Sequence, residues 1–285
     1  MNKTKKLISC ILLFSLCTFL FSYTQAEKLY FKVTFDTQGP FTISKEIDIP
    51  LNIIAVAFAL TPKIIELTNK EKTSLPEFSN NGEYVIRDKG FVNAFDRLIM
   101  NSYSKGLDIT ATGIEALSLI SPALLFLTPS TEWSAISNMY GQVLLFAYGA
   151  KELLKLCVKR ARPYMYFAGA PEKALYNGDW TSSFPSGHTT ITFASAAFLS
   201  YAFAAYFPGS KWTTPVIATA YTLALSTAVL RLFSGNHFMT DVLTGAAIGS
   251  LCGFAIPFFH YTKKVSDDKV EISATPLCAS VRIKY

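Results

Sequence analysis

His237 and Asp241, an imidazole and a carboxylate four residues apart, are the pair in this sequence best suited to nucleophilic chemistry. On a helix, residues four apart lie on one face, so the two side chains can meet. A carboxylate on one ring nitrogen fixes the tautomer and leaves the other nitrogen free to attack. The alternative is an ion pair that only ties down a loop. We expect the reactive pairing, because an ionised residue at the edge of an apolar helix is costly without a function.

A second group of candidates consists of cations near the end of an apolar segment. Lys155 and Arg162 are seven residues apart, which on a helix places both on one face, and Pro163 is expected to end that helix. Basic residues at the end of a membrane helix usually anchor it at the lipid headgroups, and we interpret Lys159 and Arg160 in this way. Lys155 lies two turns further in and must face something polar.

The third candidate is the run Phe184–His188, which precedes an apolar segment. We expect Pro185 at the first helical position, with the N–H groups of Ser186, Gly187 and His188 unpaired and pointing outward. Such a helix start binds phosphate through its N–H groups and the positive end of the helix dipole. Gly187 would let the ligand approach the backbone closely. Taken alone, this run is equally compatible with a plain helix-starting turn.

The segments that must position these residues are long and apolar. Hydrophobic residues make up 51% of the 285 residues and charged residues 16%, below the roughly 25% of soluble domains. The mean hydropathy is +0.31. We therefore expect an all-α, polytopic membrane bundle of five to six helices. The five clearest are expected at residues 113–128, 134–157, 189–207, 212–233 and 238–261. The loops between the first two and between the third and fourth are short, so these pairs are antiparallel neighbours.

The N-terminal part has a different organisation. Residues 1–26 have a basic start, an apolar middle and small residues at the end, which indicates a signal peptide or an uncleaved anchor. The apolar run 49–60 is shorter than the roughly 20 residues of a spanning helix, so we expect it to be re-entrant or interfacial. This choice keeps Lys263 and Lys264 in the cytoplasm and puts the loop 159–188 outside the inner membrane. The expected parts are a signal peptide (1–26), a strand-like segment, short apolar run and amphipathic linker (27–112), a helical core (113–264) and a polar tail (265–285).

Together these residues resemble the type 2 phosphatidic acid phosphatase superfamily, in its membrane lipid phosphatase branch. The family pattern is Lys-x6-Arg-Pro, then Pro-Ser-Gly-His, then Ser-Arg-x5-His-x3-Asp. The matching residues are Lys155, Arg162, Pro163, Pro185, Ser186, Gly187, His188, Arg231, His237 and Asp241. Leu230 departs from the pattern, because the family often has Ser there. The resemblance covers about residues 113–262 and implies a helical core like that of acid phosphatases and haloperoxidases.

The resemblance also implies a role for each matching residue. His237 attacks phosphorus and becomes phosphorylated, and Asp241 orients it. His188 protonates the leaving oxygen and then activates the water that releases phosphate. The phosphoryl oxygens are held by Lys155, Arg162, Ser186, Gly187 and Arg231. Neither a metal nor a cofactor is expected, because fixed cations neutralise the charge that a metal neutralises elsewhere.

The expected activity is metal-independent dephosphorylation of a lipid phosphate by a phosphoric monoester hydrolase of a bacterial inner membrane, with its site facing the periplasm. Candidate substrates are phosphatidic acid, phosphatidylglycerol phosphate, undecaprenyl diphosphate and a lipid A phosphate. The alternatives are a non-specific acid phosphatase, a vanadium haloperoxidase, and a non-catalytic lipid-binding or transport protein. Nucleic acid is not an expected partner, because the basic residues form no continuous stripe despite a net charge of +6.

Overall fold

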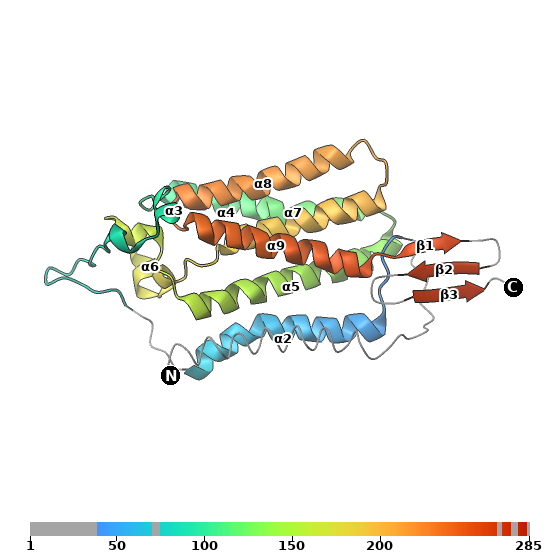
Figure 1. Ribbon diagram of the computed structural model, residues 1–285, viewed down its shortest axis with the longest axis horizontal. Coiled ribbons are helices and arrows are strands. Elements are labelled where there is room, and N and C mark those ends of the chain that lie inside the picture. The colour runs from blue at the N-terminus through green and yellow to red at the C-terminus, as the bar shows by residue number, and fades with distance from the viewer. Residues whose placement is uncertain (1–38, 70–74, 267–269, 275–278, 284–285) are drawn as a thin grey trace.

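The computed structural model describes residues 39–69, 75–266, 270–274 and 279–283, so the predicted signal peptide at 1–26 lies outside the described residues. Six long helices of the described part form a bundle (Figure 1). They are α2 (Lys45–Asn69), α4 (Lys105–Ile120), α5 (Trp133–Val158), α7 (Gly187–Tyr206), α8 (Thr213–Phe233) and α9 (Met239–His260). The predicted helical bundle is therefore confirmed, and the last four helices differ from their expected bounds by at most two residues at each end.

Shorter elements lie between these helices. They are η1 (Lys89–Phe91), α3 (Ala94–Arg97), η2 (Ser121–Leu127), η3 (Ser130–Glu132), η4 (Pro163–Tyr166), α6 (Glu172–Tyr176) and η5 (Asp179–Thr181). The expected helix 113–128 begins earlier, at Lys105, and ends in the 3-10 turn η2. Its first turns were missed because they carry polar side chains, which in this structure face the candidate site.

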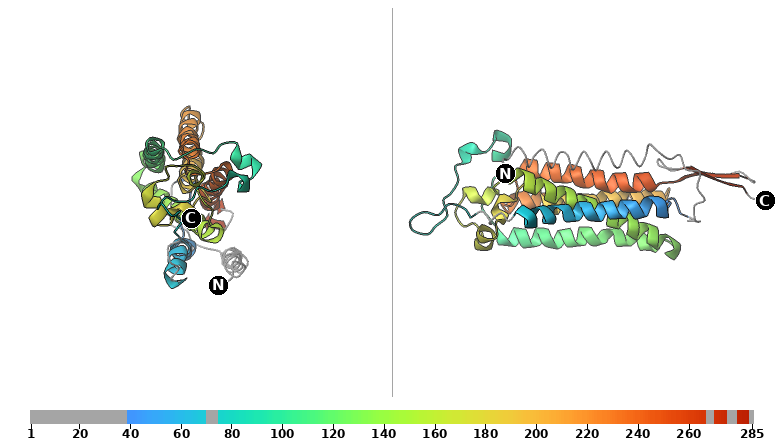
Figure 2. Two further views of the ribbon diagram at one scale, coloured as in Figure 1. Left: turned by 90° about the vertical axis from the view of Figure 1, so that its left-hand side faces the viewer. Right: turned by 90° about the horizontal axis from the view of Figure 1, so that it is seen from below.

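The outer surface of the bundle is apolar, as a lipid environment requires. Among the described helices, α2, α4 with η2, α8 and α9 are long and apolar enough to cross a membrane. Helix α7 is less apolar, and it packs against α4, α5, α8 and α9 inside the bundle (Figures 1 and 2). A helix surrounded by protein needs no lipid-facing side, so its buried serines and threonines carry little penalty. We treat all six long helices as crossing the membrane.

The prediction of a short re-entrant run at 49–60 is wrong, because α2 is one continuous helix of 25 residues. Two features disguised it in the sequence: Asn52 interrupts the apolar run, and Pro62 lies inside the helix. Its exposed surface nevertheless carries apolar residues such as Ile53 (64% exposed) and Leu67 (66%), beside the exposed ion pair of Lys63 and Glu66. The predicted strand-like segment is also corrected at its end, since residues 45–47 already belong to α2.

The polar side of α2 faces the bundle and is tied to it by hydrogen bonds. Asp48 is buried, and its Oδ1 accepts from Asn138 Nδ2 at 2.7 Å, Gln142 Nε2 at 3.0 Å and His260 Nε2 at 2.8 Å. Its Oδ2 accepts from the backbone N–H of Ser44 at 2.8 Å. This network joins α2 to α5 and α9, and buried carboxylates of this kind persist in apolar surroundings only when they are paired. His260, the last residue of α9, is part of this buried network.

Helices α7 and α9 approach each other closely because one side of α9 lacks side chains. Gly245, Gly249 and Gly253 repeat every four residues along that side. A Cβ at Gly245 would lie 2.7 Å from the carbonyl oxygen of Ser186, and one at Gly249 would meet the carbonyl of Thr190. Small residues at this spacing let helix backbones touch in membranes. The stripe therefore sets how close the N-terminus of α9 lies to the N-terminus of α7.

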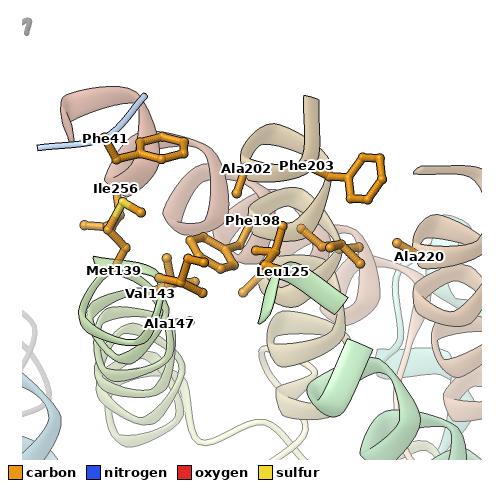
Figure 3. Packing of buried hydrophobic residues seen from close by; sticks show 14 of the residues in the cluster. Phe41, Leu125, Met139, Val143, Ala147, Phe198, Ala202, Phe203, Ala220 and Ile256 are labelled. Carbon is orange, nitrogen blue, oxygen red and sulfur yellow. The ribbon is translucent and has the colours of Figure 1, made fainter. Parts of the chain in front are cut away.

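The main apolar core lies in the half of the bundle away from the candidate site. It joins α5, α7, α8, α9 and η2, and aromatic Phe198 and aliphatic Met139 and Val143 are fully buried in it (Figure 3). Residues of this core pack without polar partners, so they fix the helices as rigid supports. This packing also holds in place the polar residues at the opposite ends of the same helices.

The C-terminal residues form a small sheet at the end of the bundle opposite the candidate site (Figure 1). Its strands are β1 (Lys263–Ser266), β2 (Val270–Ala274) and β3 (Ala279–Ile283), in the order β1-β2-β3 and antiparallel throughout. Lys263 pairs with Ala274, and Val270 pairs with Ile283. The all-α class thus describes the bundle but omits this sheet, most of which lies in the expected polar tail at 265–285.

Candidate active site

All three polar clusters of the sequence meet at one end of the bundle, the end that faces the viewer in the left view of Figure 2. The C-terminal part of α5 and the segment after it bring the first cluster. The N-terminus of α7 brings the second, and the turn between α8 and α9 brings the third. Because α5, α7, α8 and α9 alternate in direction, these four helix ends lie on the same side. The predicted convergence of the clusters is found in the structure.

His237 is buried, with 2% of its surface exposed, in the turn between α8 and α9. Its Nδ1 lies 2.7 Å from the carbonyl oxygen of Ser183. A carbonyl can only accept, so Nδ1 carries the proton and Nε2 keeps its lone pair. Arg162 Nη1 lies 3.3 Å from Nε2, which shows that the lone pair is directed toward this guanidinium. Burial, then the charges of Arg162, Arg231 and Lys155, hold the pKa of His237 well below its usual value, so the ring is neutral.

Asp241 does not form the direct hydrogen bond to His237 that the sequence led us to expect. Its Oδ2 lies 3.8 Å from His237 Nδ1, too far for a hydrogen bond. The same oxygen accepts from Ser183 Oγ at 2.5 Å and from the backbone N–H of Phe238 at 2.8 Å. The reason is that His237 precedes α9, whose first residue is Met239, so the two side chains are not stacked on one helical face. Asp241 acts on the ring through Ser183.

Lys155 and Arg162 reach the site from different elements, and the prediction that they share one helical face is wrong. Helix α5 ends at Val158, and Lys159 has a positive φ of 43°, which turns the chain out of the helix. Arg162 is extended, with φ −74° and ψ 154°. A residue before proline is disfavoured in the helical region, and Pro163 follows here. Helix α5 therefore ends before Arg162 and not at Pro163.

Each predicted phosphate-binding cation has a carboxylate partner, and these partners were not found from the sequence. Lys155 Nζ lies 3.2 Å from Glu152 Oε1, Arg162 Nη2 lies 2.7 Å from Asp179 Oδ1, and Arg231 Nη1 is paired with Asp108. Arg231 and Arg162 are also buried, with 3% and 5% exposed. Paired guanidinium groups keep a fixed orientation, and the remaining N–H donors stay available for an anion. The expected pocket of unopposed positive charge is thus a set of oriented ion pairs.

His188 lies in the first turn of α7 and contacts α4. Its Nε2 is 3.2 Å from Glu115 Oε2 and 3.2 Å from Thr112 Oγ1. The imidazole is partly exposed, unlike that of His237. The Glu115 carboxylate can accept a hydrogen bond from a proton on Nε2 and so orient the ring, an arrangement that suits a group which donates a proton. Glu115 was missed because it lies in an apolar segment and its partner is 73 residues further along the chain.

The start of α7 differs from the expectation in two details. Helix α7 begins at Gly187 with Ser186 as its N-cap, so Pro185 lies outside the helix. The N–H of Ser186 is not free for a ligand, because it donates to the carbonyl of Asp241 at 3.0 Å, and the Ser186 hydroxyl is fully buried against Thr189 Oγ1 at 2.9 Å. Gly187 stays next to the cations, since a Cβ there would lie 3.5 Å from Lys155 Nζ.

Two buried polar atoms near these ion pairs have no hydrogen-bond partner among the described residues: Arg231 Nε and the hydroxyl of Tyr164. Tyr164 follows Arg162 by two residues, and its ring packs edge-on against Tyr103, which donates to Asp108 at 2.8 Å. Buried donors without a partner are costly, and an anion within hydrogen-bond distance of either atom would satisfy that atom. Tyr164 is a candidate ligand that the sequence analysis did not identify.

Arg160 is likewise part of the site and not a headgroup anchor, as the sequence analysis had interpreted it. Its guanidinium pairs with Asp241 at 2.7 Å and with Asp96 of α3 at 2.6 Å. It also lies 4.1 Å from the ring centroid of Phe238. The side chain is 22% exposed, whereas both carboxylates are fully buried. Its position at the end of an apolar helix gave no signal of these contacts.

The arrangement is suited to phosphoryl transfer. It combines a neutral buried imidazole whose tautomer is fixed, several oriented guanidinium and ammonium groups, and a second histidine with a carboxylate partner. Phosphoryl transfer requires an in-line nucleophile, and the remaining barrier reduction comes from positioning and charge neutralisation. A buried imidazole beside guanidinium groups has no comparable use in a structural core.

Part of this chain is similar in sequence to known phosphatases. The model of the PAP2 superfamily matches residues 138–264. A lipid A 1-phosphatase of Porphyromonas gingivalis is 36% identical over 77 residues, which are 27% of this chain and 16% of that protein. A phosphatidylglycerophosphatase B of Bacillus subtilis is 30% identical over 124 residues, 42% of this chain and 57% of that protein. The chain thus spans less than two thirds of the length of either relative.

Among solved structures, a transmembrane PAP2-type phosphatidylglycerolphosphate phosphatase from Bacillus subtilis is similar over 73% of this chain and 93% of that one. The sequence identity is 21% and the TM-score is 0.39. Thr112 and Glu115, which contact His188, precede the stretch matched by the family model. Residues 138–264, which include the ends of α5, α7, α8 and α9 that form the candidate site, are thus similar to the PAP2 superfamily.

Proposed function

We propose that this protein removes the terminal phosphate from a membrane lipid, with His237 as the nucleophile and a phosphohistidine as the intermediate. The observation that carries the proposal is the protonated Nδ1 of His237, bound to the Ser183 carbonyl, with Nε2 directed toward Arg162. A buried neutral imidazole of fixed tautomer can attack phosphorus without first losing a proton. The names of the two relatives, both lipid phosphatases, support the same reaction class.

The other residues have complementary roles in the proposed reaction. Arg162, Arg231 and Lys155 bind the phosphoryl oxygens, together with the first-turn N–H groups of α7, which no helical carbonyl can satisfy. His188 protonates the leaving oxygen of the lipid. It then removes a proton from the water that hydrolyses the phosphohistidine, so the imidazole is restored at the end of each cycle.

The proposed substrate is a lipid and not a soluble phosphate ester, because the site lies at the end of membrane-crossing helices. The candidates are phosphatidic acid, phosphatidylglycerol phosphate, undecaprenyl diphosphate and a lipid A phosphate. All four place a phosphate at the level of the headgroups, where the ends of α5, α7 and α9 lie.

We further propose an inner-membrane location with the site facing the periplasm. The support is Lys263 and Lys264, which follow α9 at the opposite end of the bundle and favour the cytoplasm. Because α2 crosses the membrane and its C-terminal end lies at the site end (Figure 1), a chain that entered α2 from the periplasm would put the site in the cytoplasm. Cleavage of a signal peptide would leave the new N-terminus in the periplasm, so the chain would enter α2 from that side. A cleaved signal peptide and a site that faces the periplasm therefore exclude each other. Reporter fusions to the 208–211 loop and to the 167–171 loop decide the side.

The enzymatic proposal is tested by phosphate release from the four lipids in mixed micelles, with and without EDTA and vanadate. We expect activity that resists EDTA, is inhibited by vanadate and is lost in His237→Ala. The matched control is His260→Asn, which removes a buried histidine at the far end of the bundle and should keep the activity. Incubation with a ³²P-labelled lipid phosphate should label the wild type at an acid-labile site. Full activity of His237→Ala would refute the nucleophile, and binding of lipids without turnover would favour the transport alternative.

A further inference from the structure

Arg160 lies between two buried carboxylates that come from distant parts of the sequence. Its Nη2 donates to Asp96 Oδ2 at 2.6 Å, and its Nη1 donates to Asp241 Oδ1 at 2.7 Å. Both carboxylates are fully buried, and the guanidinium stacks on Phe238. A guanidinium held on two sides and on one face has little freedom to rotate. It therefore fixes the distance between the segment that contains Asp96 and the start of α9.

The contacts of Arg160 continue to the nucleophile through Ser183. Asp241 Oδ2 accepts from Ser183 Oγ at 2.5 Å, and the carbonyl of Ser183 accepts from His237 Nδ1 at 2.7 Å. The backbone of Ser183 is held as well, because its N–H donates to the carbonyl of Arg160 at 3.0 Å. Arg160 thus contacts Ser183 directly through its backbone and indirectly through Asp241. The orientation of the His237 ring depends on both.

The outer end of this series of contacts is anchored by Asp96 in α3. Asn93 caps α3 and donates to Asp96 Oδ2 at 2.7 Å. Thr240 at the start of α9 donates to Asp96 through its N–H at 2.9 Å and its hydroxyl at 2.8 Å. Asp96 has no role in the proposed chemistry, yet it is 0% exposed and has four donors. A buried carboxylate is stable only when it is paired, and all the partners of Asp96 lie in segments that hold the site residues in place.

We propose that Arg160 and Asp96 are positioning residues for His237: they hold Asp241 and Ser183 in the geometry that keeps Nδ1 protonated and Nε2 directed into the phosphate site. The expected effect on kcat rests on the proposed function. The expected effect on the tautomer and titration of His237 does not. This positioning role extends the catalytic unit beyond the family match at 138–264, because Asp96 lies in the segment that precedes it. Arg160 also neutralises Asp241, which would otherwise be an unpaired carboxylate 3.8 Å from the imidazole.

Removal of the Arg160 charge should change the titration of His237 in a defined direction. The groups that face His237 are Arg162 after α5, Lys155 on α5, Arg231 on α8, His188 on α7 and Asp241 on α9. The cations oppose protonation of the ring, and Asp241 favours it. In Arg160→Gln the carboxylate of Asp241 loses its cationic partner. The negative charge of Asp241 then stabilises a protonated His237 ring more strongly. The pKa of His237 should then rise, and the acid limb of the rate profile should move to higher pH.

The test combines kinetics with NMR on the full-length protein in detergent. Four variants are compared with the wild type: Arg160→Gln, Arg160→Lys, Asp96→Asn and the double variant Arg160→Gln/Asp96→Asn. The matched control is Arg97→Gln, which removes an arginine next to Asp96 that donates only to backbone carbonyls among the described contacts. The kinetic readouts are kcat, KM and the pH profile on the best lipid substrate. ¹⁵N-histidine NMR gives the tautomer and titration of His237, and with three histidines in the chain the signals can be assigned by single substitutions.

We expect Arg160→Gln to lower kcat by about 10²-fold, the loss typical of a misplaced catalytic group, with KM within about twofold. Arg160→Lys should keep part of the activity, because an ammonium can pair with one carboxylate at a time. The double variant should lose little more than Arg160→Gln alone, since both changes break one unit. Arg97→Gln should match the wild type. In the NMR titration, His237 should be protonated at higher pH in Arg160→Gln than in the wild type.

Two results would overturn the inference: an unchanged His237 titration and tautomer in Arg160→Gln, or a loss of melting temperature with kcat and pH profile intact. If Arg160→Gln does not fold, Arg160→Lys decides the question by the same readouts, with a smaller shift expected. If the wild type hydrolyses none of the lipids, the proposed function fails, and the NMR titration alone still tests the positioning role.

Discussion

Nδ1 of His237 lies 3.8 Å from Oδ2 of Asp241 and only 2.7 Å from the carbonyl oxygen of Ser183. The backbone carbonyl therefore fixes the tautomer of the imidazole, and the carboxylate supports the residue that provides this carbonyl. In serine proteases, by contrast, a carboxylate binds the histidine directly, and its replacement by an amide gives the wrong tautomer at a cost of about 10⁴ in kcat. The two arrangements predict different consequences for the same substitution.

Asp241→Asn should therefore lower kcat by about 10²-fold and not 10⁴-fold, because the Ser183 carbonyl still selects the Nδ1–H tautomer. The loss arises from the weaker hold on Ser183 and Arg160. The measurement is kcat on a lipid phosphate, with His237→Ala as the reference for complete loss. A 10⁴-fold loss in Asp241→Asn would mean that the carboxylate moves onto His237 during turnover.

The pH dependence of the nucleophile follows from its surroundings. The pKa of His237 is held well below 6.5 by burial and by the cations Arg162, Arg231 and Lys155. A nucleophile must be neutral, so activity is lost as pH falls through this low pKa, and the acid limb of kcat/KM should lie below about pH 6.5. Lys155→Met removes one of these cations, so the pKa should rise and the limb should move to higher pH.

The control for this experiment is Lys173→Met, which removes an exposed lysine of α6 at the same end of the bundle. Its acid limb should match that of the wild type. An acid limb that stays in place in Lys155→Met would show that Lys155 does not contribute to the titration of His237.

The sequence predicted those features of the structure that depend on residues close together in the chain. Bounds of α5, α7, α8 and α9 were predictable because apolar runs alternate with short polar loops. The convergence of His188, His237 and the three cations at one end of the bundle was predictable because their residue types and spacing are unusual in a membrane helix, and their roles stay predictions. Helix α2 was missed because Asn52 and Pro62 interrupt its apolar pattern.

The carboxylate partners could not be predicted in the same way. Asp108 and Glu115 of α4 meet Arg231 and His188 only after the helices have packed, at separations of 123 and 73 residues. The sequence around Asp108 resembles an ordinary polar helix start. Arg160 had an adequate local explanation as a headgroup anchor, so nothing suggested its partner Asp96, 64 residues away. Tertiary contact, and not sequence spacing, assembled this part of the site.

Glu115→Gln should weaken the proton-donor function of His188. The carboxylate oxygen Oε2 lies 3.2 Å from Nε2 and can accept a hydrogen bond from a proton on that nitrogen, whereas Arg231, Arg162 and Lys155 oppose a positive charge on the ring. Without Glu115 this acceptor is lost, so the basic limb of kcat should move to lower pH. The control is Glu172→Gln on α6, an exposed carboxylate at the same end. An unchanged basic limb in Glu115→Gln would remove Glu115 from the mechanism.

Tyr164→Phe tests the unpartnered hydroxyl near the ion pairs. The tyrosine is 1% exposed, and its hydroxyl has no hydrogen-bond partner among the described residues. If it binds a phosphoryl oxygen, its removal should weaken inhibition by vanadate by about tenfold, which corresponds to a hydrogen bond to a charged group. Removal of an unsatisfied buried hydroxyl should not lower the melting temperature. Unchanged vanadate inhibition would assign Tyr164 to packing against Tyr103.

Gly249→Ala should destabilise the protein, whereas Gly141→Ala should not, although both replace a helical glycine by a better helix former. Alanine is favoured over glycine in a helix by about 1 kcal/mol. At Gly141 of α5 the added Cβ meets nothing within 4 Å, so this gain should be retained. At Gly249 the Cβ would collide with the carbonyl of Thr190 on α7, and forcing such a contact costs about 1–3 kcal/mol. The melting temperature should therefore rise or stay constant in Gly141→Ala and fall in Gly249→Ala.

Because α7 carries His188 and α9 follows His237, separation of the two helices should also lower kcat. Equal melting temperatures in the two variants would show that the contact between α7 and α9 is looser than the structure indicates.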